Sequence, residues 1–160
     1  MRPSGLASLL TTVASVHAKP LQPDFSNTTT LPTHYGVLVF PHFQALDVFG
    51  PVDVWNTLAM WYRNSTTMHM SVLSATMDPV FTGMNPPNAF GELVLPTITF
   101  ADYLARSERG FEDDEKGELE VLLVPGGGGT RQPLTEEIAF VKTMYPKVSF
   151  ITNLNLGRPN

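Results

Sequence analysis

The sequence predicts one α/β domain built on a doubly wound parallel sheet with helices on both faces. Two observations carry this prediction. Short, uniformly apolar segments such as 35–40 and 119–124 are typical of strands that are buried on both sides. Segments with apolar residues at three- and four-residue spacings alternate with these strands. Such alternation indicates parallel strands connected by helices that cover the sheet.

Length and composition agree with a single packed domain. The chain has 160 residues, of which 42% are hydrophobic and 16% are charged, as in ordinary globular proteins. Ten basic residues oppose fifteen acidic ones, for a formal charge of −5. Without a basic stripe to neutralise phosphates, nucleic acid is not an expected partner. The absence of cysteine excludes disulfides, thiolate metal sites and cysteine nucleophiles within these residues.

The first eighteen residues have the pattern of a secretory signal peptide. Arg2 precedes an apolar run over 6–16, and small residues allow cleavage after Ala18. The run is too short and too rich in Ser and Thr to span a bilayer, so no membrane segment is expected. We therefore expect secretion; the alternative is a cytoplasmic protein with an N-terminal extension.

A linker is predicted over 19–33, where Pro, Thr and Asn occur without periodicity. The α/β domain is then expected to occupy 34–160. Two sequons, at Asn27 and Asn64, would accept glycan if the chain entered the secretory pathway.

The first half of the domain is expected to continue from the strand over 35–40 into a helix over 47–61. Its apolar residues follow helical spacing, and Pro51 is tolerated in the first turn. The segment 68–75 alternates apolar and polar residues and predicts a second strand. Shorter pieces at 79–84 and 92–96, separated by turn residues, predict a small hairpin.

The second half is expected to begin with a solvated surface loop over 106–118, which is charged and has no apolar face. The strand over 119–124 follows. A helix is predicted over 134–144, where Thr135 can cap the first turn. A final strand is predicted over 148–152.

The glycine run after Pro125 is the first candidate for chemistry. Ligands bind beyond the carboxyl ends of parallel strands, and here the backbone at Gly126, Gly127 and Gly128 can approach a ligand closely. Neither the Walker spacing nor the dinucleotide spacing is present. We favour an oxyanion-binding loop, because backbone donors need no reorganisation when charge develops; a flexible turn is the alternative.

Two side chains lie in the other loop expected at that edge. Asp47 stands between the first strand and its helix, where it can handle a proton or simply cap the helix. His42 lies ahead of it and can line a pocket or remain a surface histidine. The histidines have no partners at metal-ligand spacing, so neither a metal nor another cofactor is expected.

Several of these segments together resemble the ThiJ/PfpI family, particularly the isonitrile hydratases. The run Val37–Pro41 and the run Leu46–Val54 are similar to the opening strand, acidic loop and first helix of that family. Val124–Gly127 is similar to its glycine turn, and with Tyr145-Pro146-Lys147 the likeness extends over about 35–152. The resemblance implies a flavodoxin-like fold and the hydration of isonitriles to N-formamides, a hydro-lyase activity.

The resemblance also implies roles for individual residues. Asp47 would lie near the nucleophile, and the N–H of Gly127 would help to form the oxyanion hole. The family places a cysteine in a sharp turn after the last predicted strand, and this chain has Asn155 there. Because an amide is a very poor nucleophile, impaired or absent turnover is expected. Family domains continue beyond this turn, so the fold is expected to be truncated there.

Three functional hypotheses remain open at this point. The first is an isonitrile hydratase-like enzyme, and the second is a non-catalytic relative that binds a small molecule or pairs with a homologue. The third is a wholly structural or degraded product. A small-molecule substrate or ligand is the expected partner, and a homodimer is one way to cover the apolar surface that a truncated domain would leave exposed.

Overall fold

The computed structural model describes residues 31–84, 90–112 and 115–154. The chain divides into two units, Met1–Thr30 and Leu31–Asn160. The predicted signal peptide, most of the predicted linker and the sequon at Asn27 lie outside the described residues, as does Asn155. In the described part, no helix has both the length and the apolar character needed to cross a bilayer.

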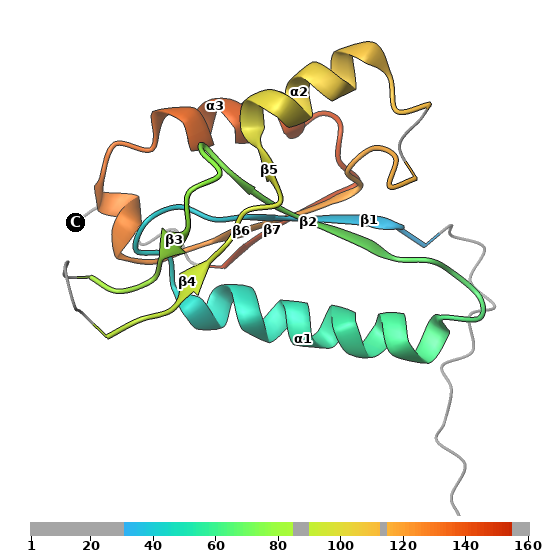
Figure 1. Ribbon diagram of the computed structural model, residues 1–160, viewed down its shortest axis with the longest axis horizontal. Helices are drawn as coiled ribbons and strands as arrows, with labels where there is room; N and C mark the ends of the chain where they lie inside the picture. Colours follow the sequence, from blue (N-terminus) through green and yellow to red (C-terminus); the bar gives the residue numbers. More distant parts are fainter. Residues whose placement is uncertain (1–30, 85–89, 113–114, 155–160) are drawn as a thin grey trace, which may run out of the picture. The chain divides into compact units, whose positions relative to one another are not determined.

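A five-stranded parallel sheet forms the centre of the second unit, with helices on both of its faces (Figure 1). The doubly wound fold predicted from the sequence is therefore confirmed. The strand order is β5-β2-β1-β6-β7. The strands are β1 (His34–Leu38), β2 (His69–Ser74), β5 (Ile98–Thr99), β6 (Val121–Pro125) and β7 (Phe150–Leu154).

Helix α1 (Ala45–Tyr62) covers one face of the sheet, while α2 (Phe100–Arg109) and α3 (Thr135–Met144) lie over the other (Figure 1). The buried core includes residues of the two central strands and of these helices. Leu38 of β1 and Leu123 of β6 are completely buried. On the α2 and α3 side, the rings of Phe100 and Phe140 stack with centroids 4.7 Å apart.

A small antiparallel hairpin, formed by β3 (Val80–Phe81) and β4 (Leu93–Val94), stands between β2 and β5 in the chain. It confirms the hairpin predicted from 79–84 and 92–96. The hairpin lies beside the first turn of α1 (Figure 1), at the carboxyl ends of the parallel strands.

Two local predictions are wrong. The segment 106–118 is not a loop from its start, because α2 continues to Arg109. The helix buries Phe100 and Tyr103, so its charged last turn faces solvent and resembles a loop in sequence. Thr135 does not cap α3 either: the N-cap position is Leu134, and no side-chain cap bond is present.

The strand order locates a topological switch point. The chain moves from β1 to β2 and β5 on one side, and from β6 to β7 on the other. The boundary between the two directions is the β1/β6 pair, in which Val37 lies opposite Leu123. In open α/β sheets, ligands bind in the crevice beyond the carboxyl ends of the strands at this point.

Candidate functional site

A hydrogen bond across the switch point joins the two segments that the sequence predicted as a site. Asp47 lies in the first turn of α1, directly beyond β1. One oxygen of its carboxylate, Oδ2, accepts the N–H of Gly126 at 3.0 Å. Gly126 is buried and immediately follows β6, whereas Asp47 is half-buried. The predicted acid and the predicted glycine loop are therefore brought together.

Backbone bonds hold the two loops in contact. The N–H of Gln44 donates to the carbonyl of Gly126 at 2.8 Å, and the N–H of Gly129 donates to the carbonyl of His42 at 3.1 Å. Phe43 forms an antiparallel bridge with Gly127. The glycine loop is thus fixed against the loop that carries Asp47.

Contact between the two loops explains why this segment needs glycine. Gly127 has φ of +129°, a conformation that side chains rarely adopt. A Cβ there would lie 2.5 Å from both the carbonyl oxygen of His42 and the amide nitrogen of Gln44. At Gly129 a Cβ would lie 2.0 Å from the carbonyl oxygen of Pro41. Any larger residue would push the loops apart.

One backbone donor of the loop remains available. The N–H groups of Gly126, Gly129 and Thr130 have acceptors inside the protein. The antiparallel bridge between Phe43 and Gly127 turns the N–H of Gly128 toward the carbonyl of His42. The N–H of Gly127 has no acceptor among the residues that the structure describes. Both glycines are half-exposed. The N–H of Gly127 is therefore suited to hold a negatively charged or strongly polar atom of a ligand.

His42 connects the hairpin to this site. The ring nitrogen Nδ1 of His42 is hydrogen-bonded to the carbonyl of Gly83. The backbone N–H of His42 donates to the carbonyl of Phe81 at 2.8 Å. Its φ is +66°, in the left-handed region that is uncommon for a residue with a side chain. The histidine is half-buried at the edge of the glycine loop, so it is more constrained than an ordinary surface loop residue.

Met84 is a site residue that the sequence reasoning missed. A Cβ placed on Gly128 would lie 2.1 Å from the Met84 sulfur, so this side chain packs directly on the glycine loop. Met84 is largely exposed and follows the hairpin strand β3. No local pattern marks it, because only the fold brings it to the loop.

The last described strand also ends at this edge. Strand β7 runs parallel to β6, with Asn153 opposite Val124 and Leu154 opposite Pro125. The next residue, Asn155, belongs to the position that the resemblance assigns to a nucleophile. Asn155 itself lies outside the described residues.

An apolar cavity of about 260 Å³ lies beside the glycine loop, between the sheet and α3. Thr130 lines this cavity, and its hydroxyl donates to the carbonyl of Gly127 at 2.8 Å. The other lining residues come from β1 and its extension, β6, α3 and its start, and β7: Leu38, Phe40, Val124, Pro125, Leu134, Glu137, Ile138, Val141, Lys142 and Ile151. The cavity can take an apolar group, and Thr130 is the residue that connects it to the glycine loop.

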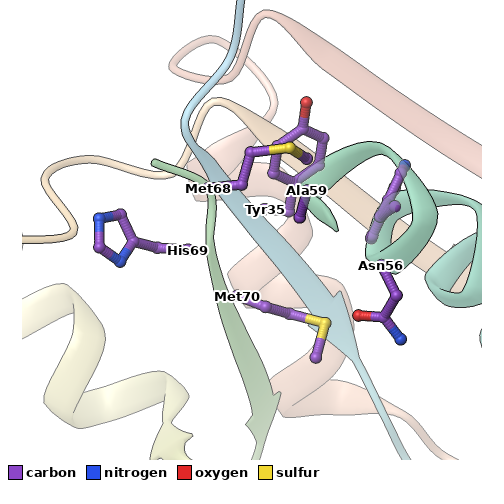
Figure 2. Close-up of a pocket in the computed structure, with 7 residues that line it drawn as sticks. Tyr35, Asn56, Ala59, Met68, His69 and Met70 are labelled. Atoms are coloured by element: carbon purple, nitrogen blue, oxygen red, sulfur yellow. The ribbon is translucent and has the colours of Figure 1, made fainter. Parts of the chain in front are cut away.

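A second, smaller hollow of about 60 Å³ lies at the opposite end of the strands (Figure 2). Tyr35, Asn56, Met68 and Met70 converge on it, while the ring of His69 points away (Figure 2). The rings of Tyr35 and Trp55 meet there with centroids 4.8 Å apart. A space of this size suits packing or a water molecule rather than an organic ligand.

A buried polar network lies at the same amino end of the sheet. His34, only 2% exposed, has its Nδ1 2.9 Å from the carbonyl of Gly117 and its Nε2 2.9 Å from the hydroxyl of Ser71. The carboxylate of Glu120 accepts the N–H and the hydroxyl of Thr33, at 2.6 and 2.9 Å. These bonds tie the start of β1 to the segment before β6, far from Asp47.

Burial raises the pKa of Glu120, but the hydrogen bonds from Thr33 and His34 outweigh it, so the pKa is lowered overall. The pKa of Tyr35 is raised by burial and by the nearby Glu120 charge. Among the described residues, no three His, Cys, Asp or Glu side chains gather where they could hold a metal ion.

Fold and geometry together define a doubly wound α/β protein with a candidate small-molecule site at its topological switch point. No protein-family model matches the chain, and no curated protein does. Among solved structures, it is similar to a ThiJ/PfpI family protein from Pseudomonas syringae. The identity is 22% and the TM-score 0.50, over 87% of this chain and 49% of that one.

An AraC family transcriptional regulator from Pseudomonas putida is similar at 18% identity and a TM-score of 0.48, over 74% of this chain and 54% of that one. The chain therefore spans about half the length of each of these proteins. The ThiJ/PfpI structure establishes that the chain has the flavodoxin-type fold of that family's structures. At this level of identity the likeness concerns the fold alone.

Proposed function

We propose that the chain is an isonitrile hydratase-like protein of the ThiJ/PfpI type that binds a small molecule at the switch point. The observation that carries this proposal is the 3.0 Å bond between Asp47 and the N–H of Gly126. It places a carboxylate beside a glycine loop in which the N–H of Gly127 has no acceptor in the described part of the chain.

The arrangement suits a molecule with a polar end and an apolar body. The free N–H of Gly127 would hold the polar end, and Asp47 would exchange a proton with it. The apolar body would enter the cavity of about 260 Å³ that begins at Thr130. An isonitrile, with a small polar N≡C group on a hydrocarbon, has this form.

Hydration of an isonitrile adds one water molecule to its carbon and nitrogen. The carbon gains the oxygen and one hydrogen, and the nitrogen gains the other hydrogen, which gives the N-formamide. In the family route a thiolate first attacks that carbon. The 160 residues contain no cysteine, and the amide of Asn155 cannot replace a thiolate. We therefore propose binding with little or no turnover.

Titration with an aryl isonitrile tests this function. Calorimetry measures binding and chromatography measures formamide. The expected result is saturable binding without formamide, weakened by Asp47→Ala because the glycine loop loses its carboxylate anchor. Asp53→Ala, on the same helix but on its exposed outer side, is the matched control and should bind normally. No saturable binding by the folded chain would refute the proposal.

Asn155→Cys tests the nucleophile position separately. If residue 155 stands where the family has its cysteine, this variant should release formamide, and adding Asp47→Asn should abolish that turnover. Asn keeps an acceptor for the N–H of Gly126 but cannot exchange the proton. Formamide release by the unaltered chain that survives Asp47→Ala would contradict the assigned roles.

We also propose that the protein is secreted, with cleavage after Ala18. Asn64 is exposed in the turn after α1, where a glycan would have room. The intact mass of the protein from its native source tests both features. A mass that includes residues 1–18 and no glycan would contradict secretion and support the cytoplasmic alternative.

A further inference from the structure

His42 lies where the hairpin meets the glycine loop, and its backbone is bonded to both. The N–H of His42 donates to the carbonyl of Phe81 in β3 at 2.8 Å, and its carbonyl accepts the N–H of Gly129 at 3.1 Å. A Cβ on Gly127 would lie 2.5 Å from the same carbonyl oxygen, so the backbone of Gly127 packs directly on His42. One residue therefore joins the hairpin to the loop that carries the free N–H.

The ring of His42 adds a second bond to the hairpin, from Nδ1 to the carbonyl of Gly83. A carbonyl oxygen can only accept, so Nδ1 carries the hydrogen of this bond. In the neutral ring Nε2 is then unprotonated, and in the charged ring both nitrogens carry hydrogen. The bond to Gly83 is thus present in both protonation states.

These contacts hold His42 in an uncommon backbone conformation. Its φ is +66°, and a residue with a side chain persists in this region where its surroundings determine the conformation. Met84, which follows β3, gives the hairpin another contact with the loop, because its sulfur packs against Gly128. The hairpin therefore holds the glycine loop at two places.

We propose that His42 is a positioning residue, which holds the hairpin against the glycine loop through Nδ1 and so fixes the N–H of Gly127. The inference rests on the proposed function, which assigns this N–H to the polar end of the ligand. In this role Nε2 does not contact the ligand. Backbone donors are effective only when they are held in place, so loss of the ring bond should weaken binding without removing a group that touches the ligand.

Two substitutions separate the ring bond from the backbone conformation. His42→Gly adopts the positive φ without strain and removes the ring. His42→Asn also tolerates this conformation, and its Nδ2 takes the place of Nδ1 as a donor to the carbonyl of Gly83. Asn has no atom in the place of Nε2. His42→Asn therefore restores the bond to the hairpin but would not restore a ligand contact through Nε2.

Amide hydrogen exchange, followed by NMR on the full chain, tests the position of the loop without a ligand. In His42→Gly the amide of Gly129 should exchange about tenfold faster, whereas that of Leu122 in β6 should change by much less. His42→Asn should restore the slow exchange of Gly129. Leu93→Ala is the matched control, because Leu93 is 68% exposed on the same hairpin, and should leave Gly129 unchanged.

Three results of the exchange experiment would overturn the proposal. The first is unchanged exchange at Gly129 in His42→Gly. The second is equal acceleration at Gly129 and Leu122, which would indicate a general loss of stability. The third is failure of His42→Asn to restore slow exchange at Gly129.

Calorimetric titration with phenyl isonitrile tests the consequence for binding. His42→Gly should weaken binding by about tenfold, and His42→Asn should recover most of the loss. Unchanged affinity in His42→Gly would contradict the positioning role. If the unaltered chain binds no isonitrile, the proposed function fails, and the exchange of Gly129 still decides whether His42 positions the loop.

The pH dependence of binding separates positioning from a direct ligand contact. The affinity ratio of the unaltered chain and His42→Asn should stay constant between about pH 5.5 and about pH 8, where histidine titrates. The charged groups of the surrounding segments are Asp47 on α1, Glu92 beside β4 and Arg131 after the glycine run; they are common to both proteins, so their effects cancel in the ratio. A ratio that falls at acid pH would show that Nε2 accepts a hydrogen bond from the ligand, and would overturn the proposal.

Discussion

Gly127 shows how one residue couples the two loops of the site. Its extended backbone with positive φ and its contact with the loop before α1 both exclude a side chain. We expect Gly127→Ala to lower the free energy of unfolding by about 3 kcal/mol or more, from backbone strain plus the steric conflict. Urea denaturation measures the change.

Gly110 provides the control for this prediction. It also has positive φ, +84°, with an extended ψ, but a Cβ there would meet no atom within 4 Å. Gly110→Ala should therefore cost only the backbone strain, about 1–2 kcal/mol. Equal losses for the two variants would mean that the contact between the loops contributes nothing.

Glu120 makes the stability of the fold depend on pH, and its hydrogen bonds with Thr33 and His34 set the direction of that dependence. Its pKa is lowered in the folded chain, so its stabilising effect is present above the pKa of the unfolded chain and is lost as pH falls through the folded pKa. We expect Glu120→Gln to cost about 1 kcal/mol at neutral pH, a modest value because the carboxylate is well solvated.

The difference between Glu120→Gln and the unaltered chain should shrink as the pH falls below the ordinary carboxyl range. Urea denaturation at a series of pH values follows it. A difference that is constant with pH would show that packing, and not the carboxylate charge, is responsible.

At the level of residues, the sequence indicated Asp47 and Gly127 because both follow predicted buried strands, whose carboxyl ends must meet at one edge. The bond between Asp47 and Gly126 agrees with that reasoning. The contacts of His42 with Gly83, and of Met84 with the glycine loop, depend on how the hairpin folds back. No periodicity encodes such long-range backbone positions.

Helix α2 owes its start to a cap that can be tested by substitution. The hydroxyl of Thr99 accepts the N–H of Asp102 at 3.0 Å and donates to that residue's carboxylate at 2.7 Å. We expect Thr99→Ala to lower the free energy of unfolding by about 1 kcal/mol. Thr135→Ala should change it by much less, because that side chain makes no cap bond at the start of α3. Thermal unfolding of both variants compares them; equal losses would contradict the capping role.

Helix α2 is also the element that the sequence did not predict. Strands β1 and β6 and helices α1 and α3 were predicted because their apolar residues are dense or periodic. Helix α2 is ten residues long and buries little more than Phe100 and Tyr103. Its charged last turn merges with the acidic segment after Gly110, so charge outweighs the apolar signal. The Thr99–Asp102 pair was the local signal that could have revealed it.

At the scale of the whole molecule, the alternation of strands and helices was enough to predict a doubly wound sheet, since parallel neighbours need crossover connections. The strand order could not be read from the sequence. It is this order, with β1 and β6 at the centre, that places the candidate site. The position of the hairpin beside α1 likewise follows from tertiary packing rather than from a local pattern.

The central position of β1 and β6 predicts a gradient of local stability across the molecule. Leu38, Leu122 and Leu123 are fully buried, and both strands are paired on each side. The hairpin has two residues per strand, and Leu93 is 68% exposed. We expect amide hydrogen exchange to be slowest in β1 and β6 and fastest in β3 and β4, since local opening there breaks few buried contacts. Mass spectrometry of peptides from each strand measures the order. Hairpin amides that exchange as slowly as those of β6 would show that the hairpin unfolds only with the sheet, which would make it part of the cooperative core.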